Sequence, residues 1–299
     1  MQFKRIKRAV HGVLLLDKPY GFSSNQALQK VKWLYQAEKA GHTGTLDPLA
    51  TGVLPICFGE ATKFAQYLTD ENKTYIADIR FGISTTTGDI EGEVIQQVDC
   101  HVSLADIEQV LPQFMGEISQ VPPMYSALKV NGKPLYAYAR DGVELMRAAR
   151  QVTIHALRVL ECADNHAKIE VCCSKGTYIR TLAEDIGNAL QAGAHLTALR
   201  RTATATYQIA KAISIDALAS MTDAQRDALL LPVDTAIAAL PKILLPEDAA
   251  YYFKQGNPVW MSGAIPHSEL RIYSEAGLFL GVGLQQRDGR IAPKRVVNL

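Results

Sequence analysis

The most informative stretch of the sequence is a glycine-rich loop that presents a single aspartate. It runs GHTGTLDPLATG from Gly41 to Gly52, and its aspartate is Asp47. Because Pro48 follows, Asp47 is restricted to extended backbone, which gives its carboxylate a fixed direction. A carboxylate presented in this way suits a nucleophile or a general base. The same composition is also typical of a tight Asp-Pro turn between a helix and the next strand.

A carboxylate in a partly dry pocket needs a cation beside it to remain ionised. The candidate is Arg180, which follows the turn Lys175-Gly176-Thr177 and lies in the first turn of the next expected helix. An Arg–Asp pair would keep the Asp47 carboxylate charged and hold its geometry in a bidentate contact. The alternative is a solvated arginine on the helix surface, which is the commoner fate of this residue type.

Two tyrosines, Tyr75 and Tyr178, could each present a flat face to a planar ligand. Tyr75 begins an alternating segment, and Tyr178 comes two residues before Arg180. A core tyrosine with a satisfied hydroxyl is the alternative for both residues.

Residues 121–140 interleave aromatic and basic side chains. The aromatic members are Tyr125, Tyr136 and Tyr138, and the basic members are Lys129, Lys133 and Arg140. Such residues on an irregular arm suit looped or single-stranded RNA, because they combine phosphate neutralisation with base stacking. A solvated charged surface is the alternative. The pattern favours an RNA partner.

The overall composition is that of a globular protein. The chain has 299 residues, of which 48% are hydrophobic, and 31 Lys and Arg against 30 Asp and Glu give a net charge of +1. This excludes a histone-like polycation, although a local basic face is enough to bind nucleic acid. No apolar run approaches the roughly 18 residues of a membrane span, and the N-terminus lacks the apolar region of a signal peptide. We expect neither a membrane protein nor a secreted one.

The five cysteines and seven histidines form no recognisable site. The number of cysteines is odd, no CxxC pair occurs, and no HExxH or similar cluster is present. A disulfide framework and a metal site are therefore not expected, and a reducing cytoplasm fits the cysteine usage best.

Hydrophobic periodicity predicts the elements that must position these residues. Strands are expected over residues 12–16, 74–82, 152–160 and 167–174. Helices are expected after Asn25 as N-cap, from Ser103, and over residues 178–199. The pair Asn131-Gly132 between apolar residues indicates a hairpin.

After residue 240 the sequence changes to short β-like segments over 270–273, 278–284 and 291–297. This indicates a separate β-domain of about fifty residues, which is marginal alone but adequate when docked. We therefore expect an α+β protein with one domain over residues 1–240 and a second over 241–299.

Five stretches together resemble the bacterial tRNA pseudouridine synthases of the TruB type, which modify the T-loop uridine at tRNA position 55. They are GVLLLDKPYGFSSNQAL, GHTGTLDPLATGVLPICFGEATK, KTY at residues 73–75, VPPMYSALKVNGKPLYAYAR and KGTYIRTLAEDIG. In this order they extend over roughly the first two hundred residues, which is far more specific than any single motif. The C-terminal region resembles the family's PUA-like RNA-binding domain more weakly.

The resemblance implies a pseudouridine synthase fold. This fold has a central, mostly antiparallel mixed sheet flanked by helices, an RNA-binding arm at about residues 116–150, and a small C-terminal PUA-like β-domain. It also implies a monomer that binds the T arm and T loop of tRNA, without a cofactor, a metal or an obligatory protein partner.

The resemblance assigns catalytic roles to three residues. Asp47 matches the catalytic aspartate, Arg180 the arginine that pairs with it, and Tyr75 the tyrosine that stacks on the target base and can move a proton. Lys18 and Pro19 match a motif that packs beside the pocket, so a structural role is expected for them.

Five further residues are expected to bind the RNA. Tyr178 and Leu199 match residues that line the uridine pocket, and His42 matches the histidine that fills the space left by the flipped nucleotide. Lys129 and Lys133 are the arm's candidates for phosphate contact.

The implied reaction breaks the N1–C1′ glycosidic bond, turns the uracil and rejoins it through C5, after flipping the base out at a cost of a few kcal/mol. Attack by Asp47 on uracil C6, attack on ribose C1′ and elimination to a glycal all stay open. Three other functions remain: a guide-RNA-dependent synthase, a non-catalytic RNA-binding or tRNA-folding protein, and a glycoside hydrolase. The hydrolase would require a second carboxylate, and no acidic partner of Asp47 is evident in the sequence.

Overall fold

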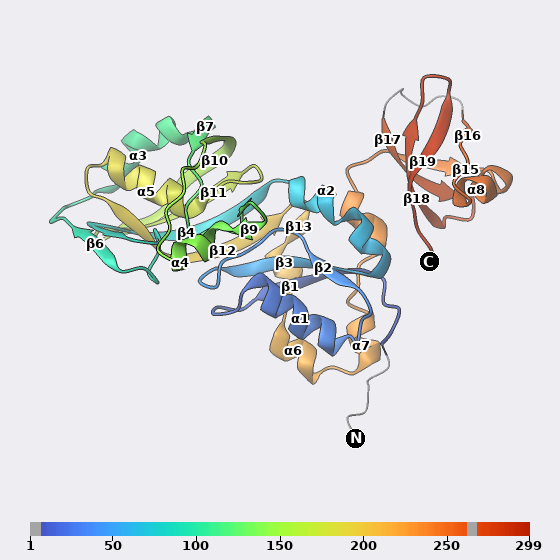
Figure 1. Cartoon of the computed structure of the whole chain (residues 1–299), viewed down its shortest axis with the longest axis horizontal. Helices are drawn as coiled ribbons and strands as arrows, with labels where there is room; N and C mark the ends of the chain where they lie inside the picture. Colours follow the sequence, from blue (N-terminus) through green and yellow to red (C-terminus); the bar gives the residue numbers. More distant parts are fainter. Residues whose placement is uncertain (1–6, 262–267) are drawn as a thin grey trace.

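The computed structural model describes residues 7–261 and 268–299, and its largest feature is a mixed sheet of ten strands (Figure 1). These are β1 (Gly12–Lys18), β2 (Ala40–His42), β3 (Thr51–Phe58), β4 (Lys73–Phe81), β7 (Gly116–Gln120), β10 (Arg150–Ala163), β11 (His166–Cys173), β12 (Ala194–Thr204), β13 (Tyr207–Gln208) and β14 (Ile213–Ser214). The main order is β14-β1-β3-β12-β4-β11-β10-β7. Only the pairs β1–β14 and β3–β12 are parallel among the described strands of this sheet. The expected mostly antiparallel mixed sheet is confirmed.

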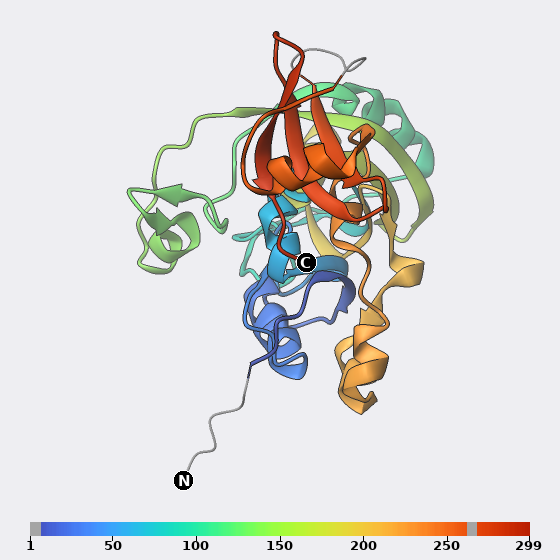
Figure 2. The ribbon, with the colours of Figure 1, turned by 90° about the vertical axis from the view of Figure 1, so that its right-hand side faces the viewer.

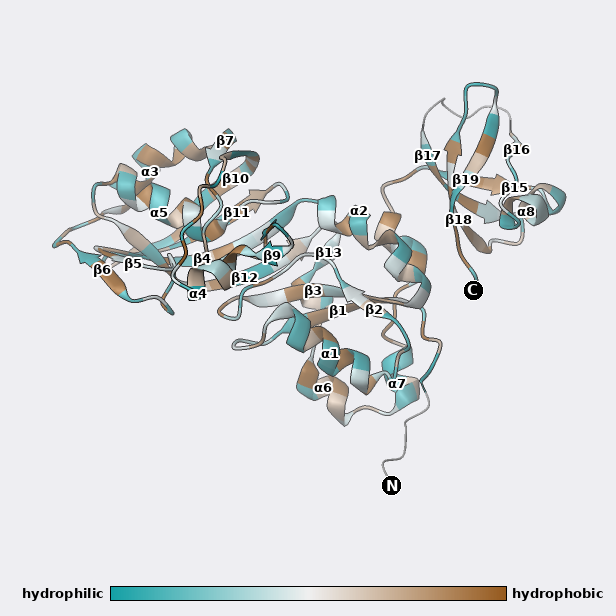
Figure 3. Cartoon of the chain, viewed as in Figure 1, coloured by the Kyte–Doolittle hydropathy of each residue, from teal (hydrophilic) through white to brown (hydrophobic). Residues whose placement is uncertain are grey.

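Helices and short 3-10 segments accompany this sheet. They are α1 (Ser24–Leu34), η1 (Gly59–Phe64), α2 (Ala65–Asp70), α3 (Leu104–Val110), η2 (Leu111–Phe114), α4 (Leu135–Arg140), α5 (Ile179–Ala189), η3 (Ile209–Lys211), α6 (Ile215–Ser220), α7 (Asp223–Asp227) and η4 (Val233–Ile237). All but α4, which lies in an arm, pack near the sheet. Figure 3 shows hydrophobic and hydrophilic residues alternating along α1, as expected for a helix that buries one face. Among the helices of residues 7–261 and 268–299, none combines the length and the hydrophobicity that a membrane span requires.

Strand β1 is buried on both faces because two apolar clusters meet across it. Leu14 and Leu16 belong to the cluster that contains the apolar sides of α1, α3 and α5. Val13 and Leu15 point the other way, into a cluster formed with η1, α2 and η4. The part of the sheet around β1 is therefore a well-packed support for the loops that leave its strand ends.

The C-terminal residues form a separate five-stranded sheet, seen at the upper right of Figure 1. Its order is β15 (Lys242–Leu245), β17 (Glu269–Ser274), β18 (Phe279–Gln285), β19 (Arg290–Val296) and β16 (Val259–Trp260), with helix α8 (Glu247–Lys254) packed on it. The three strands expected here agree with β17, β18 and β19 to within a few residues. We call residues 241–261 and 268–299 the C-terminal module.

An arm projects from the large sheet between β7 and β10, as Figure 2 shows in green. It contains α4 and the hairpin of β8 (Lys129–Val130) and β9 (Lys133–Pro134), whose turn is Asn131-Gly132. Both turn residues have positive φ angles of 53° and 80°. The predicted hairpin is confirmed, since Asn-Gly supplies these angles at low cost. A second small hairpin, β5 (Ile83–Thr85) with β6 (Val94–Gln97), follows β4.

Helix α1 begins two residues earlier than the sequence predicts. The N-cap is Ser23, whose side chain accepts a hydrogen bond from the Gln26 backbone, while the Gln26 side chain accepts one from the Ser23 backbone. The prediction that Asn25 is the N-cap is therefore wrong. Ser23 takes this position because its reciprocal capping box with Gln26 satisfies two backbone donors at once.

The predicted helix over residues 178–199 is also wrong, because α5 ends at Ala189. Gln191 and Gly193 adopt left-handed backbone with φ of 55° and 68°, which ends the helix and reverses the chain. Strand β12 then runs between β3 and β4. Leu199 therefore lies on a central strand, and the apolar spacing of this segment imitates a helix only by coincidence.

Candidate active site

A cavity of about 720 Å³ opens at the ends of the central strands. Six of the predicted site residues line it: His42, Asp47, Tyr75, Tyr178, Arg180 and Leu199. Lys129 and Lys133 do not line it, although the neighbouring arm residues 126–128 do. The structure thus brings together residues that are up to 157 positions apart in the sequence, as the pair of His42 and Leu199 illustrates.

The backbone on both sides of Asp47 is held by the segment that leads into α1. The Ser24 hydroxyl donates to the Leu46 carbonyl at 3.0 Å and accepts from the Leu46 amide at 2.7 Å. On the other side, the Gly21 amide donates to the Pro48 carbonyl at 2.9 Å. The loop therefore fixes the position from which the carboxylate of Asp47 enters the cavity.

Asp47 forms an ion pair with Arg180, with 3.0 Å between Nη2 and Oδ2. The side chain of Arg180 is only 5% exposed, whereas that of Asp47 is 38% exposed. Two carbonyls also accept from the guanidinium, that of Thr87 at 2.9 Å and that of Tyr125 at 2.7 Å. Arg180 is thus a buried, fully engaged cation and not a solvated one, and it leaves Asp47 open to the cavity.

A second carboxylate, Asp89, lies on the far side of the guanidinium, 3.7 Å from its Nη1. Asp89 is buried, and its Oδ1 accepts from the Thr87 hydroxyl and the Glu91 amide. Burial raises the pKa of Glu91, and the carboxylates of Asp89 and Asp47 add to the effect. The sequence shows no acidic partner of Asp47, but in the structure Asp47 and Asp89 share one guanidinium. Since Asp89 lies on an irregular segment between β5 and β6, no periodicity in the sequence marks it.

Arg201 is the second buried arginine of the site and was not predicted as a site residue. It is 1% exposed, its Nε donates to the Val53 carbonyl at 2.7 Å, and its Nη2 lies 3.5 Å from the Gly44 carbonyl. These contacts join the two ends of the Asp47 loop. The loop also approaches β12 closely at Gly52 (φ 107°), where a Cβ would lie 2.2 Å from the Arg201 carbonyl. Only glycine fits there.

Tyr75 lies on β4 directly opposite Arg201 of β12 and is buried apart from the part that meets the cavity. Burial raises the pKa of the Tyr75 hydroxyl, so this residue carries a proton at neutral pH. Next to it in the cavity wall, burial and then the charge of Arg201 lower the pKa of Lys73 to about 8. The sequence contained the KTY motif but no indication that its lysine is buried.

Tyr178 and Leu199 line the cavity from two different elements. Tyr178 caps α5, and its backbone amide and carbonyl both bond to the Gln120 side chain, at 3.0 and 3.3 Å. Leu199 reaches the cavity from β12. Burial raises the pKa of the Tyr178 hydroxyl. Tyr178 and Leu199 contribute an aromatic ring and an apolar side chain to the cavity lining.

His42 ends β2 at the rim of the Asp47 loop. Burial, and then the positive charge of Arg201, lower the pKa of the imidazole, which keeps it neutral at neutral pH. Its Nδ1 is buried and makes no hydrogen bond within the described residues. No group of three His, Cys, Asp or Glu residues in the described part of the chain could hold a metal ion.

The two predicted arm lysines lie outside the cavity and differ from one another. Lys133 pairs with Asp141 at 2.5 Å and lies 4.6 Å above the Tyr138 ring. Lys129 is exposed on β8. Arg140 similarly covers the Tyr136 ring. The arm tyrosines at 136 and 138 therefore stack on cations of the arm itself.

Comparisons with known proteins agree over the whole chain. Residues 32–179 match the N-terminal domain of the TruB family of pseudouridylate synthases. Residues 180–238 match the tRNA pseudouridylate synthase B C-terminal domain, and residues 241–297 match the C-terminal region of pseudouridine synthase II TruB.

Individual relatives give the same result. The tRNA pseudouridine synthase B of Methylobacillus flagellatus is 56% identical over 298 residues, covering 100% of this chain and 99% of that protein. The tRNA pseudouridine synthase B of Pseudomonas aeruginosa strain UCBPP-PA14 is 52% identical over 301 residues, with 99% of both chains covered. A solved Cbf5-Nop10-Gar1 complex contains a similar fold, with a TM-score of 0.72 at 26% identity over 96% of this chain and 84% of that chain.

Proposed function

The chain belongs to the TruB family of pseudouridylate synthases, and from this premise we propose that it isomerises uridine 55 in the T loop of tRNA to pseudouridine. The observation that carries the proposal is the ion pair of Asp47 with a buried Arg180 inside a cavity of nucleotide size. Identities of 52% and 56% to bacterial tRNA enzymes, against 26% to the protein of the Cbf5 complex, favour tRNA over a guide-RNA-dependent target.

The target uridine is buried in a folded loop and must leave its stack before it can react. The cavity offers the flipped uracil the rings of Tyr75 and Tyr178 and the apolar side chain of Leu199. An uncharged His42 at the rim has the shape and neutrality to fill the space that the base leaves in the RNA. These contacts offset the cost of unstacking, which is a few kcal/mol.

Asp47 then supplies the nucleophile, and Arg180 orients its carboxylate through their ion pair. Because Arg180 is bonded to two backbone carbonyls, it does not move with the carboxylate. Attack on uracil C6, attack on ribose C1′ and elimination to a glycal all end by joining C5 to C1′. No atom is gained or lost overall, so the enzyme is an isomerase.

Asp89 does not provide the second carboxylate of a glycoside hydrolase in this arrangement. It is buried behind Arg180, bound to a different nitrogen of the guanidinium from the one that holds Asp47. A hydrolase needs both carboxyl groups at one sugar with room for water between them.

We also propose that the chain divides at residue 240. Residues 1–240, with the arm at about 116–150, would carry out catalysis, and residues 241–299 would contact RNA as a PUA-like domain. The two separate sheets and the family match that begins at residue 241 support this division. The partner is tRNA, bound through its T arm and T loop by a single copy of the chain.

The proposal is tested with unmodified tRNA transcripts and the full-length protein. After incubation, the transcript is treated with a reagent specific for pseudouridine and mapped by primer extension. We expect conversion at one uridine of the T loop. Conversion at another position only, or tight binding without conversion, would contradict the proposal, and the second result would favour a tRNA-folding protein.

A further inference from the structure

Lys73 is a buried lysine of the active-site cavity that has no role in the reaction described above. It begins β4, is 5% exposed and lines the cavity together with Tyr75. Its ammonium donates to three backbone carbonyls, those of Leu68 at 3.3 Å, Thr69 at 2.6 Å and Glu71. An ammonium has three protons to donate, and these bonds use all of them. The charge of Lys73 is therefore fully engaged by the protein and leaves no donor for a bound nucleotide.

The three carbonyls lie at the end of α2. This helix ends at Asp70, and Glu71 is its C-cap. The carbonyls of the last turn of a helix have no partner within the helix, so they need donors from elsewhere. Lys73 supplies these donors from the strand that follows. Its bonds therefore fasten the start of β4 to the end of α2.

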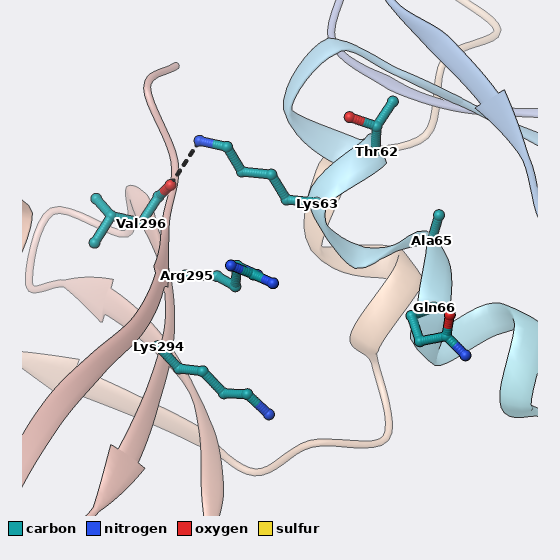
Figure 4. A pocket seen from close by; sticks show the side chains of 7 residues that line it. All are labelled: Thr62, Lys63, Ala65, Gln66, Lys294, Arg295 and Val296. Carbon is teal, nitrogen blue, oxygen red and sulfur yellow. Dashed lines mark hydrogen bonds between the residues drawn. The ribbon is translucent and has the colours of Figure 1, made fainter.

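Helix α2 is in turn held in place by the C-terminal module. Lys63 of η1, which leads directly into α2, donates to the Val296 carbonyl of β19 at 2.8 Å, the bond drawn in Figure 4. The Tyr67 hydroxyl of α2 donates to the Glu269 carboxylate of β17 at 2.5 Å. The end of α2 is therefore a fixed support for Lys73.

The pairing of β4 is interrupted between Tyr75 and the start of the strand. With β11, strand β4 pairs regularly over its whole length. With β12, Tyr75 lies opposite Arg201 but Thr74 lies opposite Ala203, so the register shifts between these two pairs. Such a shift disrupts the hydrogen-bond ladder locally. The bonds of Lys73 to α2 therefore hold β4 next to the point where one of its two ladders is broken.

We propose that Lys73 is a positioning residue for the reaction, whose ammonium anchors the start of β4 to α2 and thereby holds the ring of Tyr75 against the flipped base. The inference rests on the proposed function, in which Tyr75 contacts the target uracil. Lys73 and Tyr75 are two residues apart on one strand, so their side chains lie on the same face. A displacement at Lys73 therefore moves Tyr75 with it, and a small misplacement of a group that contacts the substrate is costly in rate.

The test compares two variants of Lys73 with a control in the core. Lys73→Met removes the three donors, whereas Lys73→Arg keeps the charge and donors on a longer side chain. Leu218 of α6 is 0% exposed and does not line the active-site cavity, so Leu218→Ala lowers the stability of the fold without changing the site. Thermal unfolding of each variant sets a temperature at which all of them are folded.

Steady-state kinetics with unmodified tRNA give the first result. For Lys73→Met we expect kcat to fall about tenfold or more and KM to stay within about threefold of the wild-type value. Lys73→Arg should retain more of kcat than Lys73→Met, and Leu218→Ala should retain the wild-type value. A raised KM with unchanged kcat for Lys73→Met, or equal losses of kcat for Lys73→Met and Leu218→Ala, would overturn the proposal.

A spectroscopic measurement reports on Tyr75 without RNA. In protein that contains 3-fluorotyrosine, the fluorine resonance that disappears on Tyr75→Phe belongs to Tyr75. We expect this resonance to shift or broaden in Lys73→Met and to stay in place in Leu218→Ala. A resonance that is unchanged in Lys73→Met would contradict the positioning role.

The outcome is separable from that of the proposed function. If the wild type forms no pseudouridine, the proposed function fails, whereas the fluorine resonance still reports whether Lys73 holds Tyr75. If wild-type turnover is normal and Lys73→Met matches it, only the positioning role fails.

Discussion

At the scale of single residues, the site combines a buried cation with an accessible carboxylate. Arg180 is 5% exposed and Asp47 is 38% exposed, so the cation is fixed by the protein while the carboxylate faces the cavity. The sequence identified both residues and their pairing through the family resemblance. Asp89 and Arg201 could not be found in this way, because their roles depend on which buried groups surround them in three dimensions.

The contacts of Arg201 predict that it positions the Asp47 loop. Arg201→Met would leave the buried Val53 carbonyl without its donor, which costs about 1–3 kcal/mol of folding stability. We expect kcat to fall about tenfold or more, since a small displacement of a reacting group is costly, while KM for tRNA changes little. Steady-state kinetics and urea unfolding measure the two effects.

The neighbouring residue provides a matched control. Arg200 points to the other face of β12 and pairs with Asp17 at 2.8 Å, so Arg200→Met should leave kcat close to the wild-type value. A conservative Arg201→Lys variant keeps the charge but cannot reproduce the planar contacts. Equal kcat values for Arg201→Met and the wild type would refute the positioning role.

The pKa of Lys73 predicts a specific pH dependence of stability. Its folded value of about 8 lies below the ordinary value of 10.5, because the residue is buried. Between these two values the unfolded chain binds more protons, so stability rises with pH. Relative to Lys73→Met, the wild type should gain at most about 3 kcal/mol between pH 8 and 10.5.

Urea unfolding of both proteins at several pH values measures this difference, and the other ionisable groups cancel in the comparison. A constant difference in unfolding free energy from pH 7 to 10.5 would show that the ammonium of Lys73 is not desolvated in the folded protein.

At the scale of elements, the sequence predicted the strands and turns whose residue pattern is local. The alternation of Tyr75, Ala77 and Ile79 places β4 within one residue, and Asn131-Gly132 places the arm hairpin. The helix expected over residues 178–199 failed because β12 owes its structure to pairing with β3 and β4. Sheet pairing joins distant segments, and a single sequence carries no direct record of it.

The arm predicts a measurable salt effect. Replacing Lys129 and Lys133 together with Gln should weaken tRNA binding and reduce the salt slope by between about 1 and 2. The lower figure applies if Lys133 keeps its pair with Asp141 when RNA is bound. A double variant of two exposed lysines elsewhere, Lys211→Gln with Lys254→Gln, is the charge-matched control. An unchanged slope would show that the arm lysines do not contact phosphates.

At the scale of the whole molecule, the C-terminal module and the rest of the chain share a continuous apolar cluster. It joins Val13 of the large sheet and Phe64 of η1 to Phe279 and Val282 of the C-terminal module. The sequence predicted a small β-domain but not its docking, because the cluster contains residues from both modules in no regular spacing.

The shared core predicts that the stability of the C-terminal module is coupled to that of the rest of the chain. Phe279→Ala removes a ring that packs on both Phe64 and Tyr273, and we expect a loss of about 3–5 kcal/mol in unfolding free energy. Tyr251→Ala, at a position 61% exposed on α8, should cost well under 1 kcal/mol. Urea unfolding compares them, and similar losses for both variants would refute a shared core.

The central claim is that the Asp47 carboxylate performs the chemistry. It is tested most directly by tritium release from tRNA carrying [5-³H]uridine, measured for the wild type and Asp47→Asn with tRNA affinity determined in parallel. We expect release by the wild type alone and a dissociation constant for Asp47→Asn within a few fold of the wild-type value. Release by Asp47→Asn at a rate near that of the wild type, or a large loss of its tRNA affinity, would contradict the account.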